Sequence, residues 1–382
     1  MIEEIQVKNF KSLKDLKLSL SNLNILAGVN GSGKSSIIQS ILLAKKYFTK
    51  YVNAGQNLNL NDSILEIGDV KDALFEGGDD ICDINTKFTN LDGYAALRML
   101  GNKTLDYFQT TNPVAVNVQI NNVKYKRFLS IQYLKAERLG PRMYQEKNSD
   151  IVDNIGEIGA SGEYVFHYLY KNLTRKINDI EVRYHENAID DSLEQQLINW
   201  LRDICPNVSN IKPRMIDGTN FVGFGFSMRT SIGESNTYRP TNVGFGLSYI
   251  LPVLVLLLTA QKGETIIIDT PEAHLHPRGQ VKVGELIAYA AADGVQVIVE
   301  THSDHIINGI RLAVVKEFIS PDVIKFLYCS LCREEGDLIA HTKIESPTIN
   351  KNGQFSYWPE GFFDQWSISL KGLLSNRTSG ED

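Results

Sequence analysis

The stretch with the clearest chemical meaning is residues 28–35, Gly-Val-Asn-Gly-Ser-Gly-Lys-Ser, which match the phosphate-binding pattern G-x-x-x-x-G-K-[ST] at every fixed position. Glycines at these places let backbone N–H groups turn toward a phosphate, and the helix that follows directs its positive end at the same anion. The ammonium of Lys34 suits the β- and γ-phosphates, and the hydroxyl of Ser35 suits Mg²⁺. The motif predicts that a nucleoside triphosphate binds with magnesium.

A second chemical feature is the β-branched run 265–268, which ends in the carboxylate of Asp269. Such a run is typical of a strand buried on both faces, and a carboxylate at its end can hold the Mg²⁺ shell. Glu272 follows on the loop that leaves this strand, and His302 follows the next predicted strand, 295–299. Carboxylate and imidazole side chains can both activate water, so these two residues are the candidate bases.

The flanking sequence predicts how these groups are positioned. Residues 24–27 form a short apolar run before the phosphate loop, and apolar residues recur at helical spacing from 37 to 42. Apolar and polar residues alternate over 1–27, which predicts two antiparallel strands leading into the loop. Residues 52–120 mix short apolar runs with Asn, Asp and Gly clusters, which predicts a peripheral β-rich region. The phosphate loop is therefore expected between a strand and a helix.

Helical patterns dominate the middle of the chain. The clearest covers 193–204, with Asp190 and Asp191 as expected caps, and no stretch there sustains the heptads of a long coiled coil. The alternating run 221–228 predicts a return to a sheet. The apolar run 249–258 is too short for a membrane span and contains Pro252, so a buried core helix is favoured.

Composition limits the class of protein. The chain has 382 residues, 43% hydrophobic and 22% charged, which is ordinary for a large folded protein. No signal peptide is visible at the N-terminus, so the sequence predicts a cytoplasmic protein without a membrane anchor and with reduced cysteines. Cys329 and Cys332 form a C-x-x-C on a predicted strand, where positions three apart face opposite sides, so core thiols are favoured.

A local basic patch is the best candidate for nucleic-acid contact, since the net charge of −6 excludes a surface that is basic overall. The alternative is a strand with a solvated cationic face. A transition-metal site is another alternative, built from His274, His276, His302, Asp304 and His305. The candidate cations of the basic patch are Lys124, Lys126, Arg127, Arg138 and Arg142, with Lys135 nearby.

The N-terminal stretch IQVKNFKSLKDLKLSLSNLNILAGVNGSGKSS resembles the opening of ABC-type ATPases of the RecF, OLD and SMC/Rad50 group. The resemblance implies an α/β fold: a P-loop NTPase with an ABC-type nucleotide-binding domain, a mixed β-sheet and an inserted helical lobe. It implies ATP and Mg²⁺ as cofactors, with Ser35 and Asp269 as metal ligands. It also implies nucleotide contacts from the phosphate loop and from a basic residue near the phosphates: Lys11, Asn30, Gly31, Ser32, Gly33, Lys34, Ser35 and Ser36.

Residues 242–248 resemble the ABC signature by position, although Leu-Ser-Gly-Gly-Gln itself is missing. The resemblance implies that Gly246 and Ser248 face the γ-phosphate of a neighbouring subunit, and that His302 belongs to the switch loop. No clear glutamine loop is present, and residues 68–72 occupy roughly its place. In most such ATPases the residue after the first Walker B carboxylate is the general base, but here it is Thr270, which cannot accept a proton at neutral pH.

We therefore expect slow hydrolysis, with Glu272 orienting the water and His302 as the other candidate base. On the same resemblance the chain divides into ATPase halves at 1–145 and 216–345, a helical insertion at 146–215, and an aromatic helix and tail at 346–382.

The stretches YLKAERLGPR, DTPEAHLHP and FSYWPEGFFDQW resemble a subfamily of these ATPases from bacterial anti-phage defence loci. The resemblance implies a switch that forms a homodimer or a higher homo-oligomer and regulates an effector, a nuclease or toxin, on a separate chain. The alternative is a DNA-repair ATPase of the RecF or Rad50 type that binds DNA directly. The aromatic residues Phe362, Phe363 and Trp366 are expected to pack on the ATPase sheet, with a partner dock as the alternative.

Overall fold

The computed structural model describes residues 1–50, 56–111, 126–177, 181–335, 339–362, 369–370 and 373. Its centre is a six-stranded sheet in the order β18-β17-β3-β16-β15-β8, in which all neighbours are parallel except β17 and β18. The strands predicted at 24–27, 265–269 and 295–299 are confirmed, and the structure places them side by side. The strands are β3 (Leu23–Gly28), β8 (Ile131–Leu134), β15 (Thr265–Asp269), β16 (Gln296–Glu300), β17 (Ile324–Cys332) and β18 (His341–Glu345).

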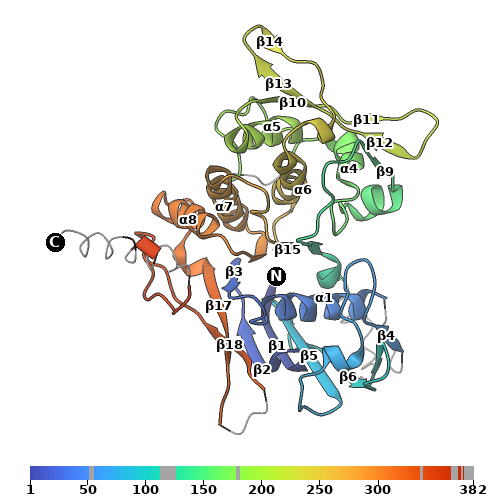
Figure 1. The fold of residues 1–382 in the computed structure, drawn as a ribbon, viewed down its shortest axis with the longest axis vertical. Helices are drawn as coiled ribbons and strands as arrows, with labels where there is room; N and C mark the ends of the chain where they lie inside the picture. Colours follow the sequence, from blue (N-terminus) through green and yellow to red (C-terminus); the bar gives the residue numbers. More distant parts are fainter. Residues whose placement is uncertain are drawn as a thin grey trace, which may run out of the picture.

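A second six-stranded sheet, antiparallel and in the order β2-β1-β5-β6-β7-β4, forms the lower part of the molecule in Figure 1. Its strands β1 and β2 are the pair predicted before the phosphate loop, and the other four come from the predicted β-rich region, which also holds the short helix α2 (Val70–Ala73). The strands are β1 (Ile2–Phe10), β2 (Leu13–Ser19), β4 (Asn57–Asn59), β5 (Ile81–Phe88), β6 (Ala95–Gly101) and β7 (Tyr107–Thr110).

Helices cover both faces of the central sheet. Helix α1 (Lys34–Lys50) packs between the two sheets, in a core that Ile267 of β15 joins. Ile266 and Ile268 point the other way, because successive strand residues face opposite sides. They join a larger core with the helices of the upper part in Figure 1, which are α6 (Phe245–Thr259), α7 (Pro277–Ala292) and α8 (Asp304–Val315). Coverage of both faces explains why residues 266–268 of β15 and 297–299 of β16 are continuous apolar runs.

A lobe above this core contains the π-helix η1 (Asp150–Ile155), α4 (Val165–Asn172) and α5 (Leu193–Ile204). The cap of α5 was predicted wrongly: it is Ser192, whose side chain accepts from the backbone N–H of Gln195, while Asp190 accepts from Ser192. The lobe also holds two three-stranded sheets, ordered β10-β13-β14 and β11-β12-β9. Their strands are β9 (Tyr144–Glu146), β10 (Val208–Ile211), β11 (Arg214–Met215), β12 (Phe221–Gly223), β13 (Phe226–Thr230) and β14 (Gly233–Glu234).

The alternating run 221–228 is divided between β12 and β13, so the single strand expected there is two short strands of different sheets. Helix α6 is buried along most of its length and accommodates Pro252, which confirms the predicted core helix. In the part of the chain that the structure describes, no helix is long and apolar enough to cross a membrane. The predicted boundaries of the four parts of the chain stay predictions.

After α8, a 3₁₀ turn η3 (Pro321–Val323) leads into the antiparallel hairpin of β17 and β18. Phe362 is 0% exposed and packs edge-to-face against Tyr328 of β17 and Phe355, which supports packing on the protein's own sheet. Phe363 and Trp366 lie outside the described residues. Cys329 is buried as expected, whereas Cys332 is only partly buried, with its Sγ 3.3 Å from His341 Nε2.

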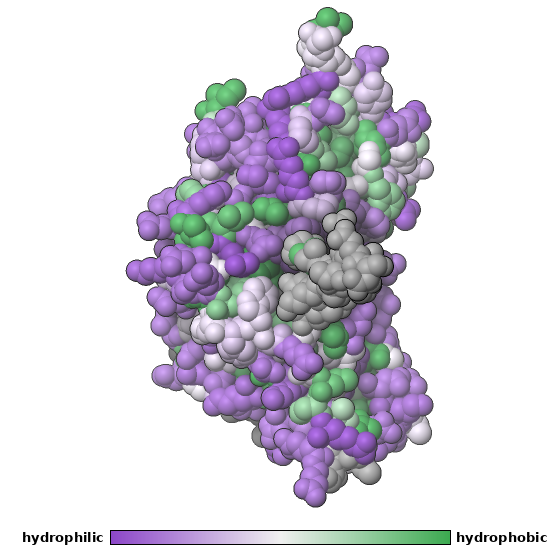
Figure 2. All heavy atoms as spheres, turned by 60° about the vertical axis from the view of Figure 1, so that its left-hand side comes forward, coloured by the Kyte–Doolittle hydropathy of each residue, from purple (hydrophilic) through white to green (hydrophobic). Residues whose placement is uncertain are grey.

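The face of the molecule in Figure 2 is the one that lies to the left in Figure 1. Apolar residues there form small separate groups between polar ones, outside the atoms drawn in grey. In the C-terminal part of the chain, exposed apolar side chains include Leu312, Val315 and Trp358. Scattered exposure of this kind is normal for a folded protein and does not by itself mark a docking surface.

Candidate functional site

The phosphate loop lies at the carboxyl end of β3, directly before α1. Gly28, Gly31 and Gly33 have φ values of 139°, 76° and 99°, which side chains with a Cβ rarely adopt. A Cβ on Gly28 would lie 2.1 Å from the carbonyl oxygen of Cys329, and one on Gly33 would lie 2.1 Å from Thr342 Oγ1. These two glycines are therefore required by the backbone and by close neighbours from the β17–β18 hairpin.

Thr342 of β18 supports the phosphate loop from the side. Its hydroxyl donates to the carbonyl oxygen of Ser32 at 3.0 Å and lies 2.8 Å from Ser12 Oγ. Its backbone N–H donates to the carbonyl oxygen of Ser12 at 2.8 Å. Nothing in the sequence pattern indicated this contact, since Ser32 and Thr342 are 310 residues apart.

Lys11 lies beside this support, next to Ser12 in the turn between β1 and β2. Its φ is 50°, its N–H donates to the carbonyl oxygen of Ala73 at 2.8 Å, and partial burial lowers the pKa of its ammonium. The turn that carries Lys11 therefore touches the phosphate loop through Ser12 and Thr342. The side chains at 69 and 72, in the region expected for a glutamine loop, form a capping box on α2.

Lys34 is buried, only 3% exposed, and is held over its own loop. Its Nζ donates to the carbonyl oxygens of Gly28 and Val29, both at 2.9 Å, and lies 3.8 Å from Glu300 Oε1. Ser35, one residue on, is exposed and donates from Oγ to Glu300, 3.1 Å from Oε2 and 3.3 Å from Oε1. The ammonium and the hydroxyl predicted for phosphate and Mg²⁺ thus share one carboxylate partner.

Three carboxylates lie near one another at this end of the sheet: Asp269 at the end of β15, Glu272 on the loop that follows, and Glu300 at the end of β16. Asp269 and Glu300 are direct partners across the parallel pair β15–β16, so both leave the same edge of the sheet. Burial raises the pKa of Asp269 and of Glu272. Burial, together with the charge of Asp269, raises the pKa of Glu300 to about 7. The sequence reasoning missed Glu300 as a site residue, although its place at the end of a buried strand was a usable signal.

Glu272 is held in a defined position. Its Oε1 accepts from the backbone N–H of His302 at 2.8 Å, while Oε2 is buried and has no partner among the described residues. The side chain of His302 reaches solvent, but the protein around it removes part of its hydration. This desolvation and the charge of Lys34 lower the pKa of its imidazole. Glu272 is thus hydrogen-bonded to the backbone of His302, and Asp269 and His302 lie close enough to affect each other's pKa, while the roles predicted for these three residues stay predictions.

The turn after Asp269 is unusual in its backbone. Thr270 has φ 49°, a left-handed conformation that is uncommon outside glycine. Its hydroxyl donates to Asp269 Oδ1 at 2.7 Å, and its N–H donates to the carbonyl oxygen of Glu300 at 2.8 Å. Arg138 completes the turn by donating to the carbonyl oxygens of Asp269 and Thr270, both at 2.8 Å.

This arrangement corrects the nucleic-acid prediction for Arg138. The side chain is 3% exposed and its guanidinium lies 5.3 Å from the ring centre of Tyr249 on α6, so it is not part of a basic surface. Its charged guanidinium donates to backbone carbonyl oxygens, in hydrogen bonds that the charge strengthens. Lys126 and Arg142 are exposed and Arg127 is partly exposed, while Lys124 lies outside the described residues.

The signature-like segment enters α6, whose N-terminal residues Gly244 and Phe245 are exposed. A Cβ on Gly246 would lie 2.7 Å from the carbonyl oxygen of His274, so this glycine permits close approach to the turn after β15. Ser248 is buried one turn into the helix, and its Oγ has no partner among the described residues. Whether Gly246 and Ser248 serve a neighbouring subunit stays a prediction.

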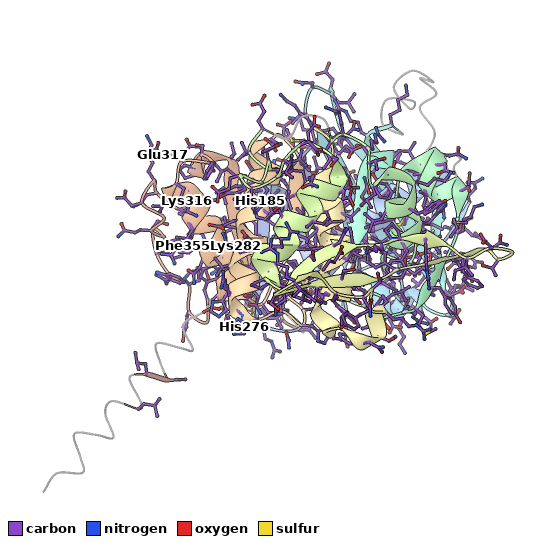
Figure 3. All side chains as sticks on the ribbon, turned by 90° about the horizontal axis from the view of Figure 1, so that it is seen from above. His185, His276, Lys282, Lys316, Glu317 and Phe355 are labelled. Atoms are coloured by element: carbon purple, nitrogen blue, oxygen red, sulfur yellow. The ribbon has the colours of Figure 1, made fainter. Side chains whose placement is uncertain are left out.

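The histidines do not form the alternative metal site. His274 packs against Phe245 and Tyr249, with ring centroids 4.7 Å and 4.5 Å away. His276 caps α7 by accepting from the N–H of Arg278, and Figure 3 places it near the edge of the molecule, apart from Lys282 and Lys316. Within the described residues, no group of three or more His, Cys, Asp or Glu side chains could hold a metal.

Comparison with known proteins agrees with this geometry. Residues 1–157 match a family model described as "AAA ATPase domain", residues 122–308 match "AAA domain, putative AbiEii toxin, Type IV TA system", and residues 319–373 match "Protein of unknown function (DUF3696)". The OLD nuclease of Thermus scotoductus is 25% identical over 95% of this chain and 68% of its own length.

Two further proteins are similar over part of the chain or in fold. The DNA double-strand break repair Rad50 ATPase of Archaeoglobus fulgidus is 47% identical, but over only 12% of this chain and 5% of its own length. The crystal structure of an SMC head bound to the C-terminal winged-helix domain of ScpA has a TM-score of 0.56 at 16% identity, covering 91% of this chain and 98% of that one.

The fold and the site define an ABC-type P-loop ATPase domain with a mixed α/β architecture, as predicted. Two AAA ATPase family models match parts of residues 1–308, the chain is similar to the OLD nuclease and, over a short segment, to a Rad50 ATPase, and it has the fold of SMC heads.

Proposed function

We propose that this protein binds ATP with Mg²⁺ and hydrolyses it slowly. The observation that carries the proposal is the meeting of Lys34 and Ser35 with Glu300, the strand partner of Asp269, at one edge of the central sheet. Lys34 exchanges the loop carbonyls for β- and γ-phosphate oxygens. Ser35 and Asp269 offer the hard oxygen ligands that suit Mg²⁺, which when bound neutralises charge on the phosphates.

Glu272 is the proposed base. It is buried on the loop after Asp269, is anchored by the N–H of His302, and keeps Oε2 free of any described partner. Burial raises its pKa, which makes the carboxylate a stronger base than an exposed glutamate. Thr270, at the position next to Asp269, instead donates its hydroxyl to Asp269. A base three positions after the metal ligand, instead of directly after it, supports slow turnover, with nucleotide occupancy as the signal.

The direct test is Lys34→Ala, with affinity for ATP measured by calorimetry in Mg²⁺. We expect at least a tenfold loss of affinity, since the ammonium gives a charged contact worth about 1.5–3 kcal/mol. Lys50→Ala is the matched control, because Lys50 is exposed at the far end of the same helix. Unchanged affinity in Lys34→Ala would refute the proposed function.

We further propose a homodimer that closes head to tail on ATP, with Gly246 and Ser248 facing the partner's γ-phosphate. The exposed N-terminal end of α6 supports this, and the burial of Ser248 means that α6 must shift for the hydroxyl to reach a neighbour. Light scattering with ATP and with a slowly hydrolysed analogue should show a doubling of mass. A constant mass under both conditions would contradict ATP-driven dimerisation.

The downstream role that we propose is a switch that regulates a nuclease or toxin on another chain, in anti-phage defence. The similarity to an OLD nuclease and the toxin-related description of one matching family support this role. Affinity purification of the native complex from wild-type and Lys34→Ala strains, with identification by mass spectrometry, tests it. A nuclease or toxin recovered only with the wild-type protein is the expected outcome. Direct, salt-dependent DNA binding that is lost in Arg142→Glu would instead favour the DNA-repair alternative.

A further inference from the structure

Glu300 stands out because the phosphate loop holds it and no predicted motif explains it. Its side chain is 4% exposed at the carboxyl end of β16. Both of its carboxylate oxygens lie within 3.3 Å of Ser35 Oγ, and Oε1 lies 3.8 Å from Lys34 Nζ. These contacts join β16 to the two side chains of the loop that the nucleotide and its metal require.

A purely structural role for Glu300 accounts poorly for this position. Burying a carboxylate costs free energy unless strong partners compensate, and an apolar or amide side chain would fill the same space at less cost. The partners of Glu300 are a hydroxyl that is itself exposed and an ammonium that already has two carbonyl acceptors. A neighbouring carboxylate, Asp269, adds repulsion. The free-energy cost of burying Glu300 with these partners indicates that its carboxylate is retained to bind a ligand.

The position of Glu300 also complements Thr270. Thr270 follows Asp269 along β15, and its hydroxyl offers no carboxylate to a metal. Glu300 lies opposite Asp269 on the adjacent strand, and its carbonyl oxygen accepts from the N–H of Thr270 at 2.8 Å. The second carboxylate of the site is thus supplied across the sheet, by β16.

We propose that Glu300 is a ligand of the nucleotide's Mg²⁺, together with Ser35 and Asp269; this inference rests on the proposed ATP-binding function. Mg²⁺ prefers octahedral oxygen coordination and is commonly bound by one or two carboxylates together with substrate phosphates. Ser35 and Glu300 already lie at hydrogen-bond distance, and Asp269 is the direct strand partner of Glu300. A single cation can therefore recruit all three side chains.

The charge of this set has a measurable consequence. Without a divalent cation, Asp269, Glu272 and Glu300 confront a polyphosphate with like charge, which opposes binding. With Mg²⁺ present, Glu300 changes from a repulsive neighbour into a ligand. Nucleotide binding by this protein should therefore depend strongly on the divalent cation, and Glu300 should account for much of that dependence.

The experiment measures the affinity for a slowly hydrolysed ATP analogue by calorimetry, in EDTA and over a series of Mg²⁺ concentrations at constant ionic strength. Free Mn²⁺, followed by electron paramagnetic resonance, gives metal affinity independently of hydrolysis. In Glu300→Gln we expect analogue affinity in EDTA to equal or exceed that of wild type. The half-saturating metal concentration should rise by roughly tenfold or more.

Glu264→Gln is the matched control: Glu264 precedes β15, at the opposite end of the strand from Asp269, and its carboxylate accepts from the N–H of Gln261. It should leave the half-saturating metal concentration unchanged. If Glu300→Gln fails to fold, Glu300→Asp replaces it in the experiment. The aspartate carboxylate is one methylene further from the metal, so the half-saturating metal concentration should again rise.

Three results would overturn the proposal. If Glu300→Gln keeps the metal dependence of the wild type but loses ATP hydrolysis, Glu300 is the base. If the variant keeps both the metal dependence and the rate of hydrolysis, Glu300 has a structural role. Equal weakening in EDTA and in Mg²⁺ would assign it to support of the loop. The proposed ATP-binding function fails separately, if Lys34→Ala keeps its affinity for ATP.

Discussion

Arg138 donates to the carbonyl oxygens of Asp269 and Thr270, each at 2.8 Å, and its guanidinium also stacks on Tyr249 of α6. One buried side chain therefore joins the end of β15, which carries Asp269, to the helix that carries the signature-like segment. The contact also fixes Thr270, whose φ of 49° needs support from its surroundings. We expect Arg138 to transmit changes at the nucleotide site to α6, because it contacts both the turn after β15 and Tyr249.

Arg138→Lys should disturb this turn while keeping the positive charge, because a single ammonium cannot reproduce the planar two-pronged contact. Leaving a buried carbonyl without its donor costs about 1–3 kcal/mol. We expect a lower melting temperature and weaker coupling of ATP to dimer formation, measured by light scattering. The control is Arg142→Lys, at an exposed position. Equal behaviour of the two variants would refute a supporting role for Arg138.

Glu272→Gln should lower ATP hydrolysis by about 10²- to 10⁴-fold, which is the usual contribution of a general base. The amide keeps an oxygen that can accept from the N–H of His302, so nucleotide affinity should change little. Phosphate release under saturating ATP measures the effect. If hydrolysis survives in Glu272→Gln and disappears in His302→Ala, the base is His302. Thr270→Glu should raise turnover if the lack of a general base directly after Asp269 limits the rate.

Thr342→Val tests the support of the phosphate loop, since it removes the hydroxyl while keeping the shape of the side chain. The carbonyl oxygen of Ser32 would lose its donor, at a cost of about 1–3 kcal/mol. We expect a lower melting temperature and several-fold weaker ATP binding by calorimetry. Thr342→Ser, which keeps the hydroxyl, should restore affinity. Failure of the serine variant to do so would assign the effect to packing.

Phe362→Ala should destabilise the protein by about 3–5 kcal/mol, as expected for a large apolar side chain removed from a packed core. The side chain is fully buried against Tyr328 and Phe355. Tyr357→Ala is the control, because Tyr357 is exposed and should cost about 0.5 kcal/mol or less. Thermal melts compare the two. Loss of a partner without a lower melting temperature would instead favour a docking role for Phe362.

Protonation of His167 should make the folded lobe less stable at low pH. It is fully buried in α4, its Nδ1 accepts from the N–H of Asn148, and burial lowers its pKa. A lowered pKa means that the fold favours neutral imidazole. Its stabilising contribution is therefore complete above the unfolded value of about 6.5 and is lost as the pH falls toward the folded pKa.

His167→Gln keeps an acceptor for Asn148 but cannot take up a proton. Melting temperatures measured between pH 7.5 and pH 5.5 should therefore fall more steeply in the wild type than in the variant. Parallel curves would show that another group controls the acid response.

Local patterns in the sequence determined much of this protein. The phosphate loop, the strand that ends in Asp269 and the buried helix around Pro252 depend on neighbouring residues, on strand or helix periodicity and on glycine conformation. Lys34, Ser35, Asp269 and Glu272 were found in this way, because each follows or interrupts a recognisable element. The predicted caps Asp190 and Asp191 missed by one or two residues, since several polar residues in a row can all accept from a first turn.

Only the tertiary structure decided which distant residues meet. Glu300 reaches Ser35 across 265 positions because β16 and β3 are adjacent parallel strands, and parallel strands bring their carboxyl ends to one edge. Arg138 looked like one cation of a basic run, yet the sheet order turns it inward to backbone carbonyls 131 and 132 residues away. Charge and spacing along a chain cannot reveal such pairings, because the free energy that selects them comes from packing two faces of one sheet.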